Sequence, residues 1–236
     1  MPARWTVTTW NVHGSAHPDL AQVAERLSAE APDVVLLQEV RKPQAAELAR
    51  RMAMRFTWAR KHSPYTQLAP RLAEGLAILT PHSLAAAGHT EISHGERSSS
   101  WKRRIAQWTL VAQPDGSTVR VYNVHLSPHV GGADGRRAEA VRLTAVVTEH
   151  GALDEVVVGG DFNDDHDSTV IYALPGIEYL SAPPTTPADA PTKCLDHVLV
   201  PIDADEVSVT VPAGDETWAA ISDHLPLTVR FTRPTP

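Results

Sequence analysis

A short segment of this 236-residue chain places polar side chains directly after a run of β-branched residues. Residues 156–163 read VVVGGDFN, a pattern that predicts a buried strand followed by Asp161 and Asn163. In an extended chain these two side chains point to the same side. Because a carboxylate and a carboxamide are costly to bury without partners, we expect a phosphate, a water molecule or a metal ion beside them.

Polar residues mark the ends of other expected strands in the same way. Those at the carboxyl end of an expected strand are Asn11, Glu39, His125 and Asp161, and those just before or at the start of one are Asp196, Asp223 and His224. Strand ends and strand starts meet at one edge only when the strands run in both directions. A parallel barrel would place every such residue at a strand end, so the pattern favours a mixed sandwich.

Three of these residues offer hard oxygen atoms to a cation. They are Glu39, Asp223 and the amide oxygen of Asn11, which are too few to enclose calcium but match Mg²⁺ or Mn²⁺. Zinc would prefer more histidine or cysteine. We therefore expect Mg²⁺ or Mn²⁺ as the cofactor.

The remaining residues suit chemistry on a phosphate. Asp161 with Asn163 would orient or deprotonate a water molecule. His125, His224 and Asn163 would donate hydrogen bonds to the oxygens of a developing phosphorane. Asp196 would hold His224 in one tautomer, as an acid behind a histidine commonly does.

The periodicity of the chain predicts many strands and few helices. Helical spacing occurs over residues 18–30, 43–54 and 136–150, and strand patterns occur over residues 4–11, 34–39, 56–60, 75–80, 105–112, 118–125, 155–161, 195–200, 206–211 and 226–232. Such a pattern favours paired sheets covered by helices. The tripeptide Asn-Val-His occurs at residues 11–13 and 123–125, each time before a helix and an acid-terminated strand, which suggests two similarly wound halves.

Length and composition predict one domain over residues 1–236. The formal net charge of −7 argues against broad attraction to nucleic acid or to an anionic membrane, although a local basic patch would still hold phosphates. No segment has the length of a signal peptide's apolar region or of a membrane span, so a cytoplasmic protein is expected. Cys194 is the single cysteine and is expected to be a small core residue.

Six short motifs in order give the chain its resemblance to a known family. They are Thr9-Trp10-Asn11, Leu37-Gln38-Glu39-Val40, Asn123-Val124-His125-Leu126, Gly160-Asp161-Phe162-Asn163, Leu195-Asp196-His197-Val198 and Ser222-Asp223-His224-Leu225-Pro226. With these motifs from end to end, the chain resembles the endonuclease/exonuclease/phosphatase (DNase I-like) family. The resemblance implies an α/β fold, a four-layer α-β-β-α sandwich with two mixed β-sheets.

The resemblance also implies a role for each site residue. Glu39 would hold a divalent metal with Asn11 and Asp223 nearby. Asp161 is similar to the family's water-activating residue and Asn163 to its orienting partner, while His125 would stabilise phosphate or assist the leaving group. His224, paired with Asp196, would contact the phosphate or act as the general base, so the choice of base between Asp161 and His224 stays open.

These implications lead to a functional hypothesis. We expect a phosphoesterase that hydrolyses phosphodiester bonds by in-line attack of water, as a nuclease acting on DNA or RNA or as a small phosphodiesterase. The alternatives are a lipid or inositol-phosphate phosphoesterase and a non-catalytic phosphate-recognition module. Neither stable membrane association nor an obligate protein partner is expected.

Several further residues are candidates for secondary roles. Arg103 and Arg104 stand before an expected strand where a family arginine often approaches phosphate, although a solvated face is the simpler interpretation. His129 is a candidate for the substrate entrance. The arginine pair at 136–137 and the acids around residue 165 are expected to be solvated, and His197 is expected to be structural.

Overall fold

The computed structural model describes residues 3–62, 72–94, 103–128, 133–151, 156–165, 177–178 and 182–233. Its strands are β1 (Ala3–Asn11), β2 (Val34–Arg41), β3 (Arg55–His62), β4 (Glu74–Thr80), β5 (Ser83–Glu91), β6 (Ile105–Ala112), β7 (Thr118–His125), β8 (Val156–Asp161), β9 (Ile177–Glu178), β10 (Asp196–Pro201), β11 (Asp205–Thr210) and β12 (Leu227–Arg233). Its helices are the 3₁₀ turn η1 (Gly14–Ala16), α1 (Leu20–Ala29), α2 (Lys42–Arg51), α3 (Ala133–Glu149) and α4 (Glu216–Ala219).

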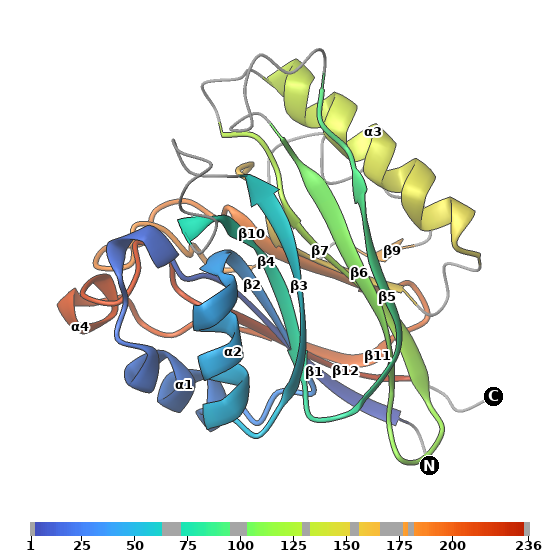
Figure 1. Cartoon of the computed structure of the whole chain (residues 1–236), viewed down its shortest axis with the longest axis horizontal. Coiled ribbons are helices and arrows are strands. Elements are labelled where there is room, and N and C mark those ends of the chain that lie inside the picture. Colours follow the sequence, from blue (N-terminus) through green and yellow to red (C-terminus); the bar gives the residue numbers. More distant parts are fainter. Residues whose placement is uncertain are drawn as a thin grey trace.

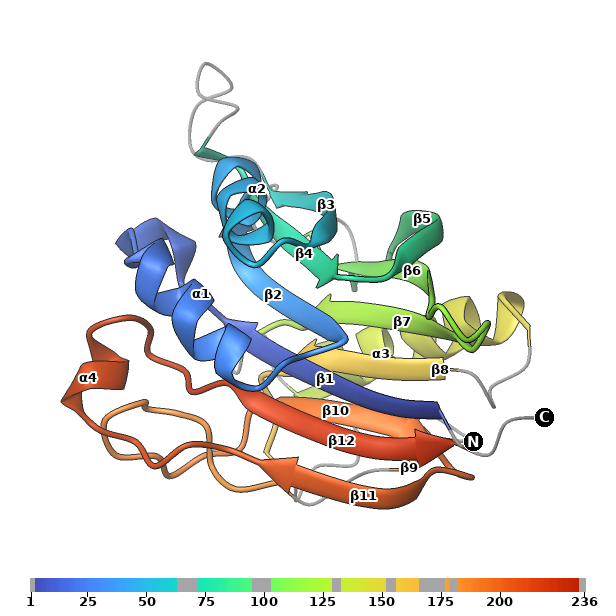
Figure 2. The same cartoon turned by 90° about the horizontal axis from the view of Figure 1, so that it is seen from below.

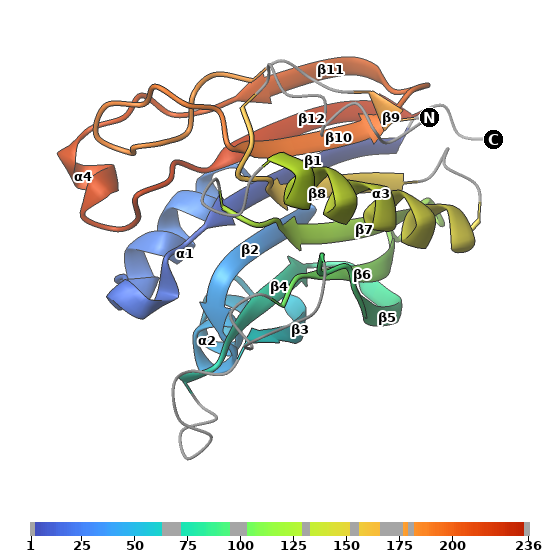
Figure 3. The ribbon, with the colours of Figure 1, turned by 90° about the horizontal axis from the view of Figure 1, so that it is seen from above.

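The strands form two six-stranded mixed sheets that pack face to face. The first sheet has the order β11-β12-β1-β2-β4-β3 and the second has the order β5-β6-β7-β8-β10-β9. Helices α1 and α2 lie on one outer side and α3 on the other (Figure 1), as the two rotated views also show (Figures 2 and 3). This confirms the α/β four-layer sandwich that the sequence predicts.

The continuous apolar runs of the central strands follow from burial on both faces. Leu36 of β2 and Val157 of β8 pack in the layer between the sheets. Leu37 lies in the cluster under α1 and α2, and Val158 lies in the cluster under α3. Because successive residues of a strand face opposite sides, each of these strands needs apolar residues at every position.

The two sheets share one sequence of strand directions. From β11 to β3 and from β5 to β9, neighbouring pairs are antiparallel, antiparallel, parallel, antiparallel and antiparallel. The parallel pair is β1-β2 in the first sheet and β7-β8 in the second, and a helix connects the strands of each pair. The two similarly wound halves expected from the repeated tripeptide are therefore present.

The sequence analysis missed four elements, η1, β5, β9 and α4. The longest of them, β5, is an edge strand with the sequence SLAAAGHTE, and most of its side chains are exposed. An exposed edge strand has no apolar face to produce alternation, so its pattern resembles a loop. Among the described helices, none is both long and apolar enough to cross a membrane.

Candidate active site

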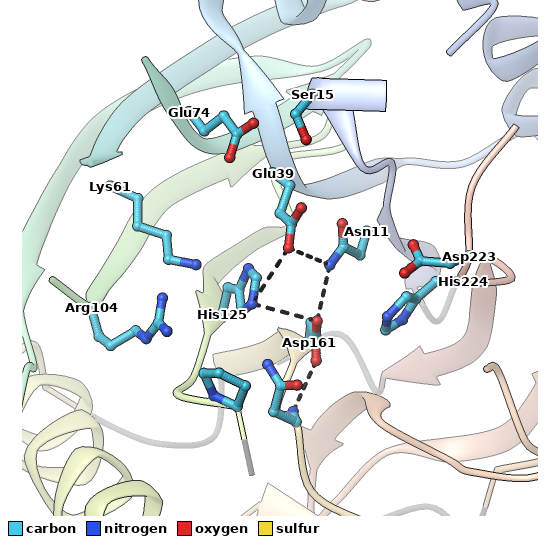
Figure 4. Close-up of a pocket in the computed structure, with 12 residues that line it drawn as sticks. Asn11, Ser15, Glu39, Lys61, Glu74, Arg104, His125, Asp161, Asp223 and His224 are labelled. Carbon is cyan, nitrogen blue, oxygen red and sulfur yellow. Dashed lines mark hydrogen bonds and ion pairs between the residues drawn. The ribbon is translucent and has the colours of Figure 1, made fainter. Parts of the chain in front are cut away.

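Strand ends from both sheets meet around one pocket of about 410 Å³ (Figure 4). The pocket is lined by Asn11, Ser15, Glu39, Lys61, Glu74, Arg104, His125, Pro128, Asp161, Asn163, Asp223 and His224. Asn11, His125 and Asp161 are the last residues of β1, β7 and β8. The expectation that strand ends and strand starts share one edge is thus met by the folded chain.

A bulge in β2 carries Glu39 to the pocket. The pairing of β2 with β4 shifts register between Leu37 and Val40, and Glu39 has a φ of 53°. A non-glycine residue in this left-handed region is strained, and such strain is characteristic of functional positions. A bulge also redirects the side chain that it carries, which here turns the Glu39 carboxylate toward Asn11.

The second sheet contributes a row of three residues across neighbouring strands. His125 of β7 is level with Asp161 of β8, which is level with Asp196 of β10. Gly160, with a φ of 144°, allows this arrangement, because a Cβ at this position would lie 2.0 Å from the backbone oxygen of Val124. Glycine at position 160 is therefore a requirement of the close approach of β7 and β8 next to the site.

A chain of polar contacts connects the two sheets. The Nδ2 atom of Asn11 donates to Glu39 Oε1 at 3.3 Å and to Asp161 Oδ2 at 3.0 Å. His125 Nε2 lies 3.6 Å from Asp161 Oδ2 and 3.9 Å from Glu39 Oε1. Figure 4 shows these four side chains pointing toward one another at the centre of the pocket.

Asp161 occupies a position that favours its protonated form. Burial raises the pKa of Asp161 to about 6, assisted by the negative charge of Asp196 and opposed by His224 and by the hydrogen bond from Asn11. Its other oxygen, Oδ1, accepts the backbone N–H of Asn163 at 2.8 Å. Asn163, with a φ of 51°, donates its side-chain amide to the Leu126 carbonyl at 3.0 Å, which fixes its orientation.

His224 is held by the acid behind it. Its Nδ1 lies 2.7 Å from Asp196 Oδ2, which also accepts the hydroxyl of Thr185 at 2.6 Å. Burial alone would lower the pKa of His224, but Asp196, with Asp161 and Asp223, raises this pKa to about 10. The raised pKa favours the cationic imidazole near neutral pH, with its Nδ1 at Asp196.

The segment that carries Asp223 and His224 is fixed to β1. Trp10 Nε1 donates to the His224 carbonyl at 2.8 Å, and the Ser222 hydroxyl donates to the Asn11 carbonyl at 2.6 Å. Asp223 Oδ1 lies 3.4 Å from His13 Nδ1. Trp10, Asn11 and Ser222 belong to the conspicuous sequence motifs, and their contacts explain why these motifs extend beyond the charged residues.

Two basic side chains form the wall of the pocket opposite Asp223 and His224 (Figure 4). Lys61, near the end of β3, is 4% exposed, and Arg104, directly before β6, is 7% exposed. Arg104 Nε donates to Ser127 Oγ at 3.1 Å, and the Ser127 hydroxyl in turn donates to Glu139 Oε1 at 2.6 Å. Burial and the charge of Arg104 lower the pKa of Lys61 to about 7, against the opposing effects of Glu39, Asp161 and Glu74.

Most of the residues singled out from the sequence meet here. Asn11, Glu39, Arg104, His125, Asp161, Asn163, Asp223 and His224 line the pocket, and Asp196 stands directly behind His224. Arg103 does not line it, because its guanidinium turns away to Glu91 at 3.5 Å and to the Arg60 carbonyl at 3.2 Å. His129 lies outside the described residues.

Two expectations next to the pocket have different outcomes. His197 is structural, because its Nε2 lies 2.8 Å from the Asp164 carbonyl and its ring packs edge-on against Phe162. The expected solvation of Asp164 and Arg136 is wrong, since both are buried and lie 3.2 Å apart. The cause is that α3 begins at Ala133, earlier than predicted, and its first turn packs against the loop after β8.

The sequence analysis also missed residues that the pocket uses. Lys61 and Glu74 stood just outside the predicted strands 56–60 and 75–80, and Ser15 stood in a glycine-containing loop. Thr185 lay in a proline-rich segment with no local signal for its contact with Asp196. Their places depend on long-range contacts of the folded chain, which the local pattern around each residue does not display.

The donor set of the pocket fits a hard divalent cation. Four carboxylates line it, those of Glu39, Glu74, Asp161 and Asp223, together with the amide of Asn11. Donor atoms of Asp161, Asp196 and His224 also lie within 4.8 Å of one another, but Asp196 Oδ2 and His224 Nδ1 are engaged with each other. In the present orientation Asn11 directs its NH₂ group, and not its oxygen, at the two carboxylates. Its carboxamide must turn to become a ligand.

The two sheets pack as a sandwich with acids and histidines at the edge where the pocket lies. A model of the Endonuclease/Exonuclease/phosphatase family matches residues 8–224. The chain therefore belongs to the endonuclease/exonuclease/phosphatase family, as its motifs predicted. This family consists generally of hydrolytic phosphoesterases that depend on divalent metals.

Solved structures share the fold at low sequence identity. An endonuclease/exonuclease/phosphatase family protein from Bacteroides thetaiotaomicron is 16% identical, with full coverage of both chains and a TM-score of 0.78. A mannosyl-6-phosphatase from the same species is 16% identical over 96% of this chain and 99% of its own, with a TM-score of 0.75. The human Nocturnin catalytic domain with bound sulfate is 18% identical over 98% of this chain and 93% of its own, with a TM-score of 0.75. No curated protein matches the sequence closely enough to count as a relative.

Proposed function

We propose that this chain is a divalent-metal-dependent hydrolase of phosphoric esters that uses in-line attack of a water molecule. The observation that carries the proposal is the contact network of Asn11, Glu39, Asp161 and His125, which joins both sheets in one pocket. Buried acids and amides gathered in one pocket lower the stability of the fold, so their presence points to a bound ligand or a reaction that requires them.

Asp161 is the residue best suited to accept the proton of the attacking water. A general base works best when its pKa lies near the operating pH, and the pKa of Asp161 is raised to about 6. His224 has a pKa raised to about 10 and carries a proton already. This contrast favours Asp161 as the base and assigns His224 the role of a cationic donor to a phosphate oxygen.

The other residues orient and stabilise. Asn163 is held next to Asp161 by its backbone N–H and would orient the water molecule. His125, 3.6 Å from Asp161 Oδ2, would donate to the phosphate or to the leaving oxygen. Asp196 positions His224 and maintains its charge.

A divalent cation would be held by Glu39 and Asp223, with Asn11 after its amide has turned. Mg²⁺ or Mn²⁺ is the expected ion, since the pocket offers oxygen donors. When bound, such an ion stabilises negative charge on the phosphate and on the leaving oxygen. The protein's own contribution is the fixed placement of the carboxylates around that position.

The substrate is a phosphoric ester, and two classes remain candidates. A phosphodiester in DNA, in RNA or in a smaller molecule is the class expected from the sequence. A phosphomonoester, including an inositol phosphate, fits the same chemistry, and one protein of this fold is a mannosyl-6-phosphatase. The net charge of −7 favours a small substrate over a long polyanion.

Hydrolysis assays with purified protein test the proposal. The substrates are 4-nitrophenyl phosphate, bis(4-nitrophenyl) phosphate, a dinucleotide, single-stranded and duplex DNA, and a phospholipid, each with Mg²⁺, Mn²⁺ or EDTA. We expect metal-dependent release of product from at least one of them, with Glu39→Gln reducing it by about 10²-fold or more. Folded protein that hydrolyses none would favour the non-catalytic phosphate-recognition module instead.

A further inference from the structure

Lys61 is a buried basic side chain that an anionic ligand would hold in its charged form, because burial lowers the pKa of the free amine to about 7. Its side chain lines the pocket and points toward the centre, near His125 (Figure 4). Across the described part of the chain, no hydrogen bond or ion pair engages the Lys61 ammonium. Burial of a charged amine without a direct partner is unfavourable and is expected where a ligand supplies the partner.

Arg104 directs a second positive charge at the same place. Among the described residues, the one side-chain contact of its guanidinium is from Nε to Ser127, and Figure 4 shows the guanidinium in the pocket on the same side as Lys61. The charges of Glu39 and Asp161 act on both basic groups. The two cations therefore face the carboxylates around which the scissile phosphate would bind, and they lie on the opposite side from Asp223 and His224.

We propose that Lys61 and Arg104 form a dicationic wall that recognises the terminal, dianionic phosphate of a phosphomonoester. This inference rests on the proposed hydrolytic function and names its substrate class. A phosphomonoester has three non-ester oxygens and, with a second pKa near 6, about two negative charges at neutral pH. An internal phosphodiester has two such oxygens and one charge.

The electrostatics of the pocket explain the need for this wall. Four carboxylates line the pocket and repel an entering anion, and the repulsion is greater for a dianion than for a monoanion. A metal ion and His224 offset part of that repulsion on one side, and Lys61 and Arg104 offset it on the other. The third non-ester oxygen of a monoester would lie on the side of Lys61 and Arg104. A diester would carry its second carbon substituent at that place.

The reaction balances without a further reactant. The water oxygen forms a bond to phosphorus while the bond between phosphorus and the ester oxygen breaks. The ester oxygen leaves with the electron pair and takes up a proton, and the second proton of the attacking water is retained on the phosphate. The products are an alcohol and inorganic phosphate.

The test compares 4-nitrophenyl phosphate with bis(4-nitrophenyl) phosphate in wild-type protein and in Lys61→Gln. We expect the wild type to prefer the monoester, and Lys61→Gln to lower kcat/KM for the monoester by about 10²-fold and for the diester by about threefold or less. Lys193→Gln makes the same charge change at an exposed lysine that does not line the pocket, and it is expected to behave as wild type. Lys61→Met and thermal unfolding check that the effect does not come from misfolding.

Binding of inorganic phosphate gives a second readout that requires no turnover. Calorimetry in the presence of Mg²⁺ should give a Kd for phosphate that rises about tenfold or more in both Lys61 variants and is unchanged in Lys193→Gln. Equal losses on both esters, or a wild-type preference for the diester, would overturn this inference while leaving the hydrolase proposal intact. The absence of metal-dependent hydrolysis of either ester by wild-type protein would instead contradict the proposed function.

Discussion

The tripeptide Asn-Val-His occurs once in each half of the molecule, and its two copies have different surroundings. In the first half, Asn11 ends β1 and lines the pocket, and His13 stands beyond the strand with a φ of 44° and a partly exposed side chain. In the second half, Asn123 is fully buried inside β7, and it is His125 that ends the strand at the pocket. In the second copy the strand therefore reaches the pocket two residues later, at the histidine instead of the asparagine.

This difference gives the two asparagines different tasks. Asn123 ties the sheets together, since its Nδ2 donates to the carbonyls of Leu37 and Ala77 at 3.0 and 2.9 Å and its Oδ1 accepts from Gln38 at 2.8 Å. Asn11 instead donates to two carboxylates of the pocket. The same residue type in equivalent strands therefore supports the fold at Asn123 and the site at Asn11. The difference is the position of the asparagine relative to the end of its strand.

The two halves also divide the chemistry. The first sheet and the segment before its strand β12 contribute Asn11, Glu39 and Asp223, which suit a cation. The second sheet contributes His125 and Asp161, which suit the handling of water and of the leaving oxygen. This division predicts that changes in the second half reduce turnover strongly while leaving metal binding in place. Changes in the first half should affect metal binding directly.

The largest effect is expected for Asp161→Ala. Without the carboxylate, no group at this position accepts the proton of water or the amide of Asn11, and turnover should fall by about 10³- to 10⁴-fold. Steady-state kinetics on the best substrate measures this, with circular dichroism to show that the fold is kept. Activity within tenfold of wild type would move the role of base to His224.

The next largest effect distinguishes the two histidines of the repeated tripeptide. His125→Ala should lower kcat by about 10²- to 10³-fold, because this side chain lies among the reacting groups. His13→Ala should lower it only a few-fold, since the half-exposed His13 ring lies beside the exposed Asp223 and the backbone contact of His13 to Asn11 is kept in the variant. Parallel kinetics of the two variants are the measurement, and equal losses would mean that this difference between the halves has no functional meaning.

The sequence predicted the framework of this site well for a physical reason. A polar residue at the end of an apolar strand is visible in a linear pattern, so Asn11, Glu39, His125 and Asp161 were identified together with the shared rim. The six motifs supplied the family and hence the four layers. The fold followed because strands buried on both faces have continuous apolar sequences that are hard to mistake.

Other parts of the site depend on contacts that the sequence does not display. Lys61 and Glu74 are basic and acidic residues at strand ends, where a solvated position is the usual outcome. Thr185 reaches Asp196 only through the path of a proline-rich loop. Arg103 and Arg104 are neighbours of the same type, and local strand geometry alone decides that Arg104 enters the pocket while Arg103 turns to Glu91.

A smaller effect, on stability, separates the two asparagines. Asn123→Leu leaves the buried carbonyls of Leu37 and Ala77 without their donor and should lower the free energy of unfolding by about 2–4 kcal/mol. Asn11→Leu should lower it by about 1 kcal/mol or less, because its neighbours can turn to water in the pocket. Urea denaturation measures both. A larger loss for Asn11→Leu than for Asn123→Leu would contradict the assignment of Asn123 to the scaffold.

The smallest effect concerns pH and metal binding together. The folded-state pKa of Asp161 is raised from 3.8 to about 6, so the folded protein loses stability as pH rises through this window and the carboxylate forms. A divalent cation favours the charged carboxylate, so the gain in Tm on adding Mg²⁺ should be larger at pH 8 than at pH 5, by a few degrees for about 1–2 kcal/mol. Thermal unfolding with and without Mg²⁺ at both pH values measures this. Glu39→Gln in the first half should remove most of the Tm gain from Mg²⁺. Asp161→Asn in the second half should keep the Tm gain but remove most of its dependence on pH. The reverse result would overturn the division of chemistry between the halves.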